Sequence, residues 1–384
     1  MAGGKLYFTA AEASGDLFAG EVIDDLRARD SALHVRGIGG FEIAARAETP
    51  DIDTSALNVL GLWEGIKAYG DVRRISSEIA DDIIAYKPDA VVLVDSWGLS
   101  LRVAKKVRAR DPAIRLIKLI GPQVWASRAG RAKTLADSVD HLLCMHSFET
   151  PYYEPYGLPV TVIGQPALAR SEQLSAEAFR KRQGLSSKDD LLLVLPGSRG
   201  AEIELVAPVL VEAAKKISSR SEHVKVCIAP ARAVLTQFKE TFPNLPPSWM
   251  LLEDEGRRYE AMAAAQLAIT CSGTVNTELA VQRTPFITGY KIGTISWILL
   301  KTFLFKAKFV TLLNMAADAM IAPEYLQDVM TAGAMADEAL RLLNNRALLE
   351  KQVEKQDAAL AKMGLGGRSA QSLSAEAILS DLKG

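Results

Sequence analysis

Short apolar runs alternate along the chain with longer segments in which apolar residues recur at helical spacing. Apolar runs of four to six residues predict buried parallel strands, because helices cover both faces of such a sheet. The first predicted strands are Lys5–Ala10, Ala90–Val94, Arg115–Ile120, His141–Met145 and Val160–Ile163. Helical patterns fit between several of them, for example over Phe18–Arg29 and Val72–Tyr86. This order predicts a doubly wound α/β sheet.

A second series of strand patterns follows the polar stretch Ala167–Asp190, which we interpret as an interdomain connection. The strands of this series are Leu191–Pro196, His223–Ala229, Met250–Leu252, Leu267–Thr270 and Thr284–Tyr290. Beyond Met335 the pattern is helical. We therefore expect two Rossmann-like domains facing a cleft, over residues 1–168 and 169–345. A helical tail over residues 346–384 is expected to pack back on the N-terminal domain.

Composition narrows the functional classes. The chain has 384 residues, 49% of them hydrophobic, so it exceeds the length at which one core usually divides. A net charge of −1 gives no general affinity for nucleic acid.

Cys144, Cys227 and Cys271 are isolated in or beside apolar runs, which indicates buried thiols in a reducing compartment. No Cys/His spacing indicates a metal site. The N-terminal apolar run is too short for a signal peptide, so we expect a cytoplasmic protein.

The segment Leu191–Glu204 carries the most informative pattern: an apolar strand, the turn Pro-Gly-Ser-Arg, and a helix start. A helix N-terminus after a glycine turn favours an anion, and a guanidinium suits a phosphate or diphosphate. Gly197, Ser198 and Arg199 are therefore candidate binding residues. Glu202, near the start of the helix, is a further candidate. The alternative is a plain connection in which Arg199 pairs with Glu202 or Glu204.

The same design returns over Leu267–Ala280, where Ser272, Gly273 and Thr274 follow a strand and Glu278 lies one helical turn further. Two such turns predict a cradle for a nucleoside diphosphate, with Glu278 accepting from ribose hydroxyls. The alternative for Glu278 is a solvated acid in the first turn of a helix. No Walker pattern is present, which argues against ATP hydrolysis.

The N-terminal half has its own candidates. Ser14, Gly15 and Asp16 follow the first strand, where open α/β sheets meet their ligands, although Asp16 also suits a helix N-cap. Asp95 ends an apolar strand and is positioned for a general base or, alternatively, to cap the next helix. The turn at residues 121–128 holds three more candidates, which are Gln123, Trp125 and Arg128; for Trp125 the alternative is a core position.

Several motifs together resemble the lipid-A-disaccharide synthases, inverting glycosyltransferases of the GT-B architecture. They are AEASGD at 11–16, VLGLWE at 59–64, GPQVWASR at 121–128, VTVIGQPAL at 160–168, LPGSRGAEIE at 195–204, SGTVNTELA at 272–280, TGYKIG at 288–293 and LLNMAADAMIAPEYLQ at 312–327. The resemblance covers nearly the whole length. The combination of GPQVWA and PGSRxxEI is specific.

The resemblance implies transfer of a 2,3-diacylglucosamine from UDP to the 6-hydroxyl of 2,3-diacylglucosamine 1-phosphate, with UDP leaving and no cofactor or metal. It implies that Asp95 and Arg199 are essential and that Asn314 belongs to a functional motif that contributes to UDP binding. Asp95 would accept the hydroxyl proton, and Arg199 would offset charge on the leaving diphosphate. Three departures put acceptor, acyl-chain or phosphate specificity in question: Gly98 replaces an aspartate, Gln165 a histidine, and the motif at Asn314 lacks its arginine.

The segment Ile295–Val310 predicts contact with a membrane. It mixes aliphatic residues and the aromatics Trp297, Phe303, Phe305 and Phe309 with three lysines, and it is too short and charged to span a bilayer. An interfacial helix fits this pattern, and a buried core helix is the alternative. We expect a peripheral protein on the inner face of the inner membrane of a Gram-negative bacterium, with a homodimer possible.

Three alternative functions stay open from the sequence. The first is a relative that uses another glycolipid acceptor. The second is a UDP-sugar epimerase, which shares the two-domain architecture. The third is a non-catalytic protein that binds lipid or nucleotide. The aromatic and lysine segment argues against the epimerase, because a soluble sugar nucleotide requires no lipid surface.

Overall fold

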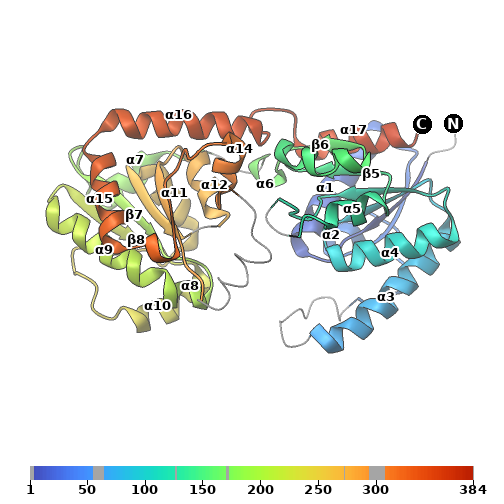
Figure 1. Ribbon diagram of the computed structural model, residues 1–384, viewed down its shortest axis with the longest axis horizontal. Helices are drawn as coiled ribbons and strands as arrows, with labels where there is room; N and C mark the ends of the chain where they lie inside the picture. The colour runs from blue at the N-terminus through green and yellow to red at the C-terminus, as the bar shows by residue number, and fades with distance from the viewer. Residues whose placement is uncertain are drawn as a thin grey trace. The chain divides into compact units, whose positions relative to one another are not determined.

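The computed structural model describes residues 4–54, 65–125, 128–169, 173–271, 273–293 and 308–383. The chain forms two compact units (Figure 1). Unit 1 contains Met1–Ala169 together with Met363–Gly384, and unit 2 contains Arg170–Lys362. Each unit is built on one six-stranded sheet in which every neighbouring pair of strands is parallel.

The sheet of unit 1 has the strand order β2-β1-β3-β4-β5-β6. Its strands are β1 Lys5–Thr9, β2 His34–Ile38, β3 Ala90–Val94, β4 Arg115–Leu119, β5 His141–Cys144 and β6 Val160–Val162. Its helices are α1 Ala13–Arg29, α2 Phe41–Ala44, α3 Gly65–Tyr86, α4 Trp97–Arg110, α5 Arg131–Ala136, α6 Pro166–Ala169 and α17 Ala370–Asp381.

Alternate residues of these strands enter two separate cores. Tyr7, Val91 and Leu93 pack with α3 and α4 on one face, whereas Phe8 and Val92 pack with α1 and α17 on the other. Figure 1 shows α3 and α4 on one side of this sheet and α17 on the other. The continuous apolar runs reflect burial on both faces.

The sheet of unit 2 has the order β12-β11-β10-β7-β8-β9. Its strands are β7 Asp190–Leu195, β8 Val224–Ile228, β9 Met250–Leu251, β10 Leu267–Cys271, β11 Phe286–Tyr290 and β12 Glu324–Leu326. Its helices are α7 Ala176–Arg182, α8 Gly200–Leu205, α9 Ala207–Arg220, α10 Leu235–Thr241, α11 Arg258–Ala264, α12 Val275–Val281, α14 Leu312–Ala317, α15 Ala332–Leu343 and α16 Arg346–Lys362. The pair α9 and α15 covers one face of this sheet.

The predicted strands are confirmed, and two strands were missed. β2 contains His34, Arg36 and Gly37, so it offers no continuous apolar run. β12 is a three-residue edge strand that begins with Glu324 and is only partly buried. A strand pattern based on apolar runs finds the central strands of a parallel sheet and overlooks such short edges.

The C-terminal helices divide between the two units. Gln352 and Gln356 of α16 donate to backbone oxygens of Phe286 and Thr284, which holds α16 in unit 2. The chain enters unit 1 at Met363, later than the position 346 expected from the sequence. Gly364 has φ +105°, and a Cβ there would lie 3.0 Å from the Cα of Gly164. Close backbone contact therefore requires glycine at this crossing.

A partly buried ionic contact anchors α17 to the sheet of unit 1. Asp381 Oδ2 lies 2.6 Å from His141 Nδ1, and Asp381 Oδ1 accepts a hydrogen bond of 2.8 Å from Arg115. Burial acts to raise the pKa of Asp381, but the contacts with His141 and Arg115 outweigh it and hold this pKa below its ordinary value of 3.8. His141 therefore has a structural role.

We expect Asp381→Asn to lower the free energy of unfolding by about 2 kcal/mol, because charge-assisted hydrogen bonds are lost. A carboxyl with a depressed folded pKa contributes stability above its unfolded pKa and loses it as the pH falls through the folded value. The deficit of Asp381→Asn should thus be full at neutral pH and shrink below pH 3.8. Urea unfolding at several pH values measures this.

Glu376→Gln is the matched control on the same helix, since Glu376 forms an exposed pair with Arg368. It should leave the unfolding midpoint unchanged. A deficit of Asp381→Asn that stays constant down to pH 2.5, well below the usual aspartate pKa of about 3.9, would contradict the ionic anchor.

Cys144, Cys227 and Cys271 are all buried, as predicted. Among the residues that the structure describes, no helix has both the length and the hydropathy required to cross a bilayer.

Candidate functional site

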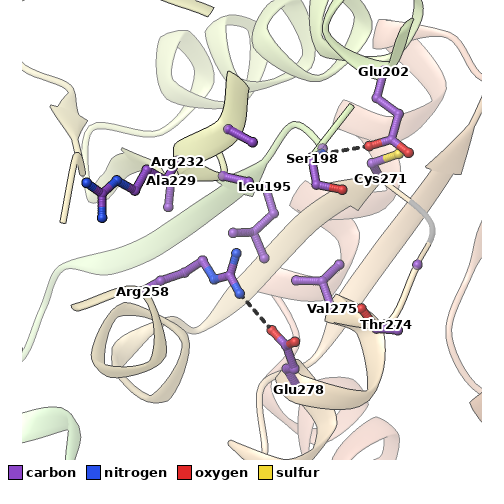
Figure 2. A pocket seen from close by; sticks show the side chains of 14 residues that line it. Leu195, Ser198, Glu202, Ala229, Arg232, Arg258, Cys271, Thr274, Val275 and Glu278 are labelled. Carbon is purple, nitrogen blue, oxygen red and sulfur yellow. Dashed lines mark hydrogen bonds and ion pairs between the residues drawn. The ribbon is translucent and has the colours of Figure 1, made fainter. Parts of the chain in front are cut away.

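A pocket of about 610 Å³ lies in unit 2, at the carboxyl ends of β7, β8 and β10 (Figure 2). The loops after these strands and the helices α8, α11 and α12 line it. The lining includes Gly197, Ser198 and Glu202 after β7, Ala231 and Arg232 after β8, Gly273, Thr274 and Glu278 after β10, and Arg258 at the start of α11. The structure thus brings both predicted glycine turns to one pocket, at the edge of the sheet where open α/β folds bind ligands.

The first turn is held by Glu202. Its carboxylate accepts hydrogen bonds from the backbone N–H groups of Ser198, at 2.7 Å, and Arg199, at 3.2 Å. Gly197 has φ +127°, and a Cβ there would lie 2.5 Å from Glu202 Oε2. Glu202 therefore caps α8 and fixes the turn, and glycine is required at 197.

Arg199 is the N-cap of α8 and directly follows the pocket residue Ser198, but it does not itself line the pocket, and its side chain is 80% exposed. Its guanidinium lies 3.3 Å from Glu202 Oε1, so the pairing that the sequence left open is present. A surface pair of this kind contributes about 0–1 kcal/mol. The guanidinium can therefore exchange this partner for a stronger anion at low cost.

In the second turn, Glu278 Oε2 lies 3.2 Å from a guanidinium nitrogen of Arg258, and Figure 2 shows the two side chains directed at each other. Gly273 and Thr274 line the pocket beside them, whereas Ser272 lies outside the described residues. The sequence interpretation missed two cations, Arg232 and Arg258. Both occur in or just after loops that follow strands of the second series, and this position was the signal that could have identified them.

Asn314 lies elsewhere in unit 2 and is fully buried. Its Oδ1 accepts from the backbone N–H groups of Ile321 and Ala322, and its Nδ2 donates to Ala322 O and Glu324 Oε1, at 2.8–2.9 Å. These contacts hold the turn between α14 and β12. Asn314 does not line the pocket at the ends of β7, β8 and β10.

Asp95 lies at the carboxyl end of β3 in unit 1, with φ +43°, and Ser96 follows with φ +25°. Its carboxylate faces the backbone N–H groups of Ala11 and Glu12, at 3.4 and 3.3 Å. Burial raises the pKa of Asp95 to about 6; Lys118 acts to lower this pKa and Glu12 to raise it. A carboxyl with this pKa suits a general base near neutral pH.

The neighbouring candidates have different positions. Asp16 is buried and accepts from the backbone N–H groups of Gly40, Glu42 and Ile43, so it caps α2 rather than its own helix. Ser14 and Gln123 are exposed. Trp125 is 7% exposed and packs edge-on against Phe148, which favours the core alternative for this residue. Arg128 is exposed.

A second hollow of about 430 Å³ lies beside the loop that holds the Asp95 carboxylate. Ala11 and Glu12 contribute to its lining, and so do the apolar side chains of Leu17 and Phe41. Phe41 is 80% exposed, which is unusual for a large apolar side chain. The hollow therefore combines apolar surface with the loop whose backbone N–H groups contact the candidate base, although Asp95 itself does not line it.

Gly15 is required by the position of Asp95. A Cβ at Gly15 would lie 1.7 Å from Asp95 Oδ2. We expect Gly15→Ala to displace this carboxylate and to lower the rate of the transfer that the family resemblance implies at least about tenfold. Alanine favours a helix over glycine by about 1 kcal/mol, so the loss should occur in a folded protein. Steady-state rates and melting temperatures measure both effects.

Gly70→Ala is the control, because Gly70 lies in α3 and a Cβ at this position would have no heavy atom within 4 Å. It should keep the wild-type rate. A wild-type rate for Gly15→Ala would show that the carboxylate does not depend on this contact.

Most of the segment Ile295–Val310, including Trp297, Phe303 and Phe305, lies outside the described residues. Its described end packs in unit 2. Phe309 is 7% exposed, and Lys308 lies over its ring and pairs with Asp318 at 3.0 Å.

Comparison with known proteins identifies the family. The model of the Lipid-A-disaccharide synthetase family matches residues 6–378. A lipid-A-disaccharide synthase from Paramagnetospirillum magneticum is 32% identical over 378 residues, which cover 97% of this chain and 96% of that protein.

Solved structures are similar over the whole chain at low identity. A putative UDP-N-acetylglucosamine 2-epimerase from Listeria monocytogenes has a TM-score of 0.61 and 14% identity, with 99% of this chain and 95% of that chain covered. MurG from Acinetobacter baumannii has a TM-score of 0.56 and 15% identity, with 98% and 99% covered. These likenesses show the fold alone, and they confirm two Rossmann-like domains of the GT-B type. The full-length sequence matches go further: the chain belongs to the lipid-A-disaccharide synthase family of glycosyltransferases.

Proposed function

We propose that this protein transfers 2,3-diacylglucosamine from its UDP carrier to the 6-hydroxyl of 2,3-diacylglucosamine 1-phosphate. The bond between the sugar C1 and the diphosphate oxygen breaks, the bond between C1 and the acceptor O6 forms, and UDP leaves. The acceptor hydroxyl gives its proton to Asp95. The observation that carries the proposal is the pocket in unit 2, where two glycine turns meet guanidinium groups.

The donor nucleotide suits this pocket. Its volume of about 610 Å³ is within the range of small-molecule sites. Ser198 and Thr274 provide hydroxyls, and the N-termini of α8 and α12 provide a positive dipole for the diphosphate. Arg199 and Arg232 then supply charge that stabilises the leaving UDP without a divalent cation.

The acceptor suits the hollow beside Asp95 in unit 1. Leu17 and Phe41 offer apolar surface to an acylated sugar, and the loop at Ala11 and Glu12 carries the contacts that hold the Asp95 carboxylate. The raised pKa of Asp95 allows its carboxylate to take a proton from a hydroxyl in the transition state.

UDP release tests the proposal. The purified protein is incubated with UDP-2,3-diacylglucosamine, with and without 2,3-diacylglucosamine 1-phosphate. Release that depends on the acceptor, with a disaccharide 1-phosphate as product, supports the transfer. Release without an acceptor, or none with both substrates, would contradict it. Epimerisation of UDP-N-acetylglucosamine, followed by NMR, would instead support the epimerase alternative named from the sequence.

We also propose that the protein works at a membrane surface, because both substrates are lipids and the sequence of residues 295–310 combines aromatics with lysines. Replacing Trp297, Phe303 and Phe305 with serine should reduce co-sedimentation with anionic phospholipid vesicles several-fold. UDP affinity should be unchanged. A sharp fall in melting temperature would instead favour a core helix and contradict the membrane role.

A further inference from the structure

Lys118 is a buried lysine in the centre of the unit 1 sheet, in the middle of β4. Its side chain is 1% exposed, and its neighbours in the strand are apolar. Lysine is almost never fully buried unless its ammonium is paired. The transfer reaction as described above gives this residue no role.

Its ammonium is surrounded by acceptors at the end of β3. Lys118 Nζ donates to Leu93 O at 3.1 Å, to Ser100 Oγ at 3.2 Å, and to the backbone oxygen of Asp95. Ser100 Oγ in turn donates to the same Asp95 oxygen at 2.9 Å. The three N–H bonds of the ammonium are thus all used, and two of the three acceptors are Asp95 or a direct partner of it.

These contacts complete the support of Asp95. The carboxylate end is held by the backbone N–H groups of Ala11 and Glu12. The peptide end lies in the left-handed region, which aspartate and serine adopt only when the surroundings impose it. Lys118 and Ser100 hold the carbonyl of this strained turn, so the residue is fixed on both sides.

We propose that Lys118 is a positioning residue for the transfer: it holds the Asp95 turn in place and supplies a buried positive charge that favours the Asp95 carboxylate. This proposal rests on the proposed role of Asp95 as the base. Lys118 lies three residues beyond the start of β4 and pairs with Leu93 of β3. This position places its ammonium at the end of β3 and not in either hollow.

The charges around Asp95 support this role. Among the described residues, the charged groups that face it are Lys118 from β4 and Glu12 from the loop before α1. Burial and Glu12 both raise the pKa of Asp95, and Lys118 acts against them. Burial likewise lowers the pKa of Lys118, while Asp95 and Glu12 raise it. Each charge therefore favours the other, and removal of the ammonium must raise the pKa of Asp95.

The pH dependence of kcat/KM for acceptor-dependent UDP release tests the proposal. The acid limb of this profile is the pH range in which kcat/KM falls because Asp95 becomes protonated. Lys118→Gln keeps N–H donors but removes the charge, so we expect the acid limb to move to a higher pH by about one unit. Lys118→Met removes both, so the limb should move similarly and the plateau rate should fall about tenfold. Lys118→Arg retains the charge and should keep the limb near its wild-type position.

Lys106→Met is the matched control, because Lys106 also donates to a serine hydroxyl and a backbone carbonyl, those of Ser77 and Arg73, away from Asp95. Its profile should be that of the wild type. If Lys118→Met does not fold, Lys118→Gln carries the test alone. An acid limb that stays in place in the folded neutral variants, whatever their plateau, overturns the proposal for Lys118. A wild-type rate for Asp95→Asn would instead overturn the proposed base.

Discussion

Asp95→Asn is expected to lower the rate of acceptor-dependent UDP release by about 10²- to 10⁴-fold, the usual contribution of a positioned general base. The amide keeps the size of the carboxylate, and its single oxygen can still accept from one of the backbone N–H groups of Ala11 and Glu12, which donate to separate oxygens of Asp95. It cannot accept the hydroxyl proton. UDP affinity should stay within about twofold of wild type, since the mutation removes an interaction of the transition state only.

The pH profile adds a second readout for Asp95. Burial raises the pKa of this carboxyl to about 6, so the base is protonated and inactive below that pH. The wild-type kcat/KM should therefore fall about tenfold per pH unit below pH 6, and the residual rate of Asp95→Asn should lack this acid limb.

Asp111→Asn provides the control, because Asp111 also follows the end of a unit 1 element and accepts from a nearby backbone N–H, that of Ala113. It should behave as the wild type in rate and in UDP binding. If Asp95→Asn reduced UDP affinity and turnover together, the carboxylate would have a structural role and the proposed base would be wrong.

The strands that position both hollows were predictable from the sequence, for a definite reason. β3, β7 and β10 are buried on both faces, so their sequences are continuous apolar runs, and the loops after them hold Asp95, Ser198 and Thr274. Burial of this kind leaves a local signal in the sequence. Where a strand lies at the edge, as β12 does, the signal disappears although the strand remains.

Long-range contacts could not be predicted in the same way. The sequence suggested that Asp16 caps its own helix or meets the acceptor; the structure shows that it caps α2, through residues more than twenty positions away, and that it lines the second hollow. Lys118 has the appearance of a break in an apolar strand, and its meaning depends on Leu93, Asp95 and Ser100. The role of such a polar residue follows from the partners that the fold supplies, which no local pattern specifies.

The turn that holds Arg199 and Glu202 has some features that the sequence predicted and one that it did not. The strand, glycine turn and helix start were predicted, and so was the pairing of Arg199 with Glu202 as an alternative. The cap that Glu202 forms with the backbone N–H groups of Ser198 and Arg199 was not. This distinction matters for mutagenesis, because Glu202 stabilises the turn whereas Arg199 contributes little to stability.

Arg199→Ala is therefore expected to separate catalysis from stability. Loss of one preorganised donor at a developing charge lowers the rate by about 10²- to 10³-fold. The side chain is 80% exposed and its pair with Glu202 is weak, so the melting temperature should stay within about 1 °C of wild type. Turnover, UDP binding and thermal unfolding are measured on the same preparation.

Arg341→Ala is the matched control for this variant. Arg341 also lies in unit 2, pairs with a glutamate three residues away, Glu338, and is 54% exposed. Arg199 directly follows the pocket residue Ser198, whereas neither Arg341 nor a residue next to it in the sequence lines that pocket, so the loss of Arg341 should leave the transfer rate unchanged. A fall of less than about tenfold for Arg199→Ala in a folded protein, well short of the expected range, would make Arg199 a surface ion-pair residue. The charge that stabilises the leaving diphosphate would then have to come from Arg232 or Arg258, whose residues line the pocket.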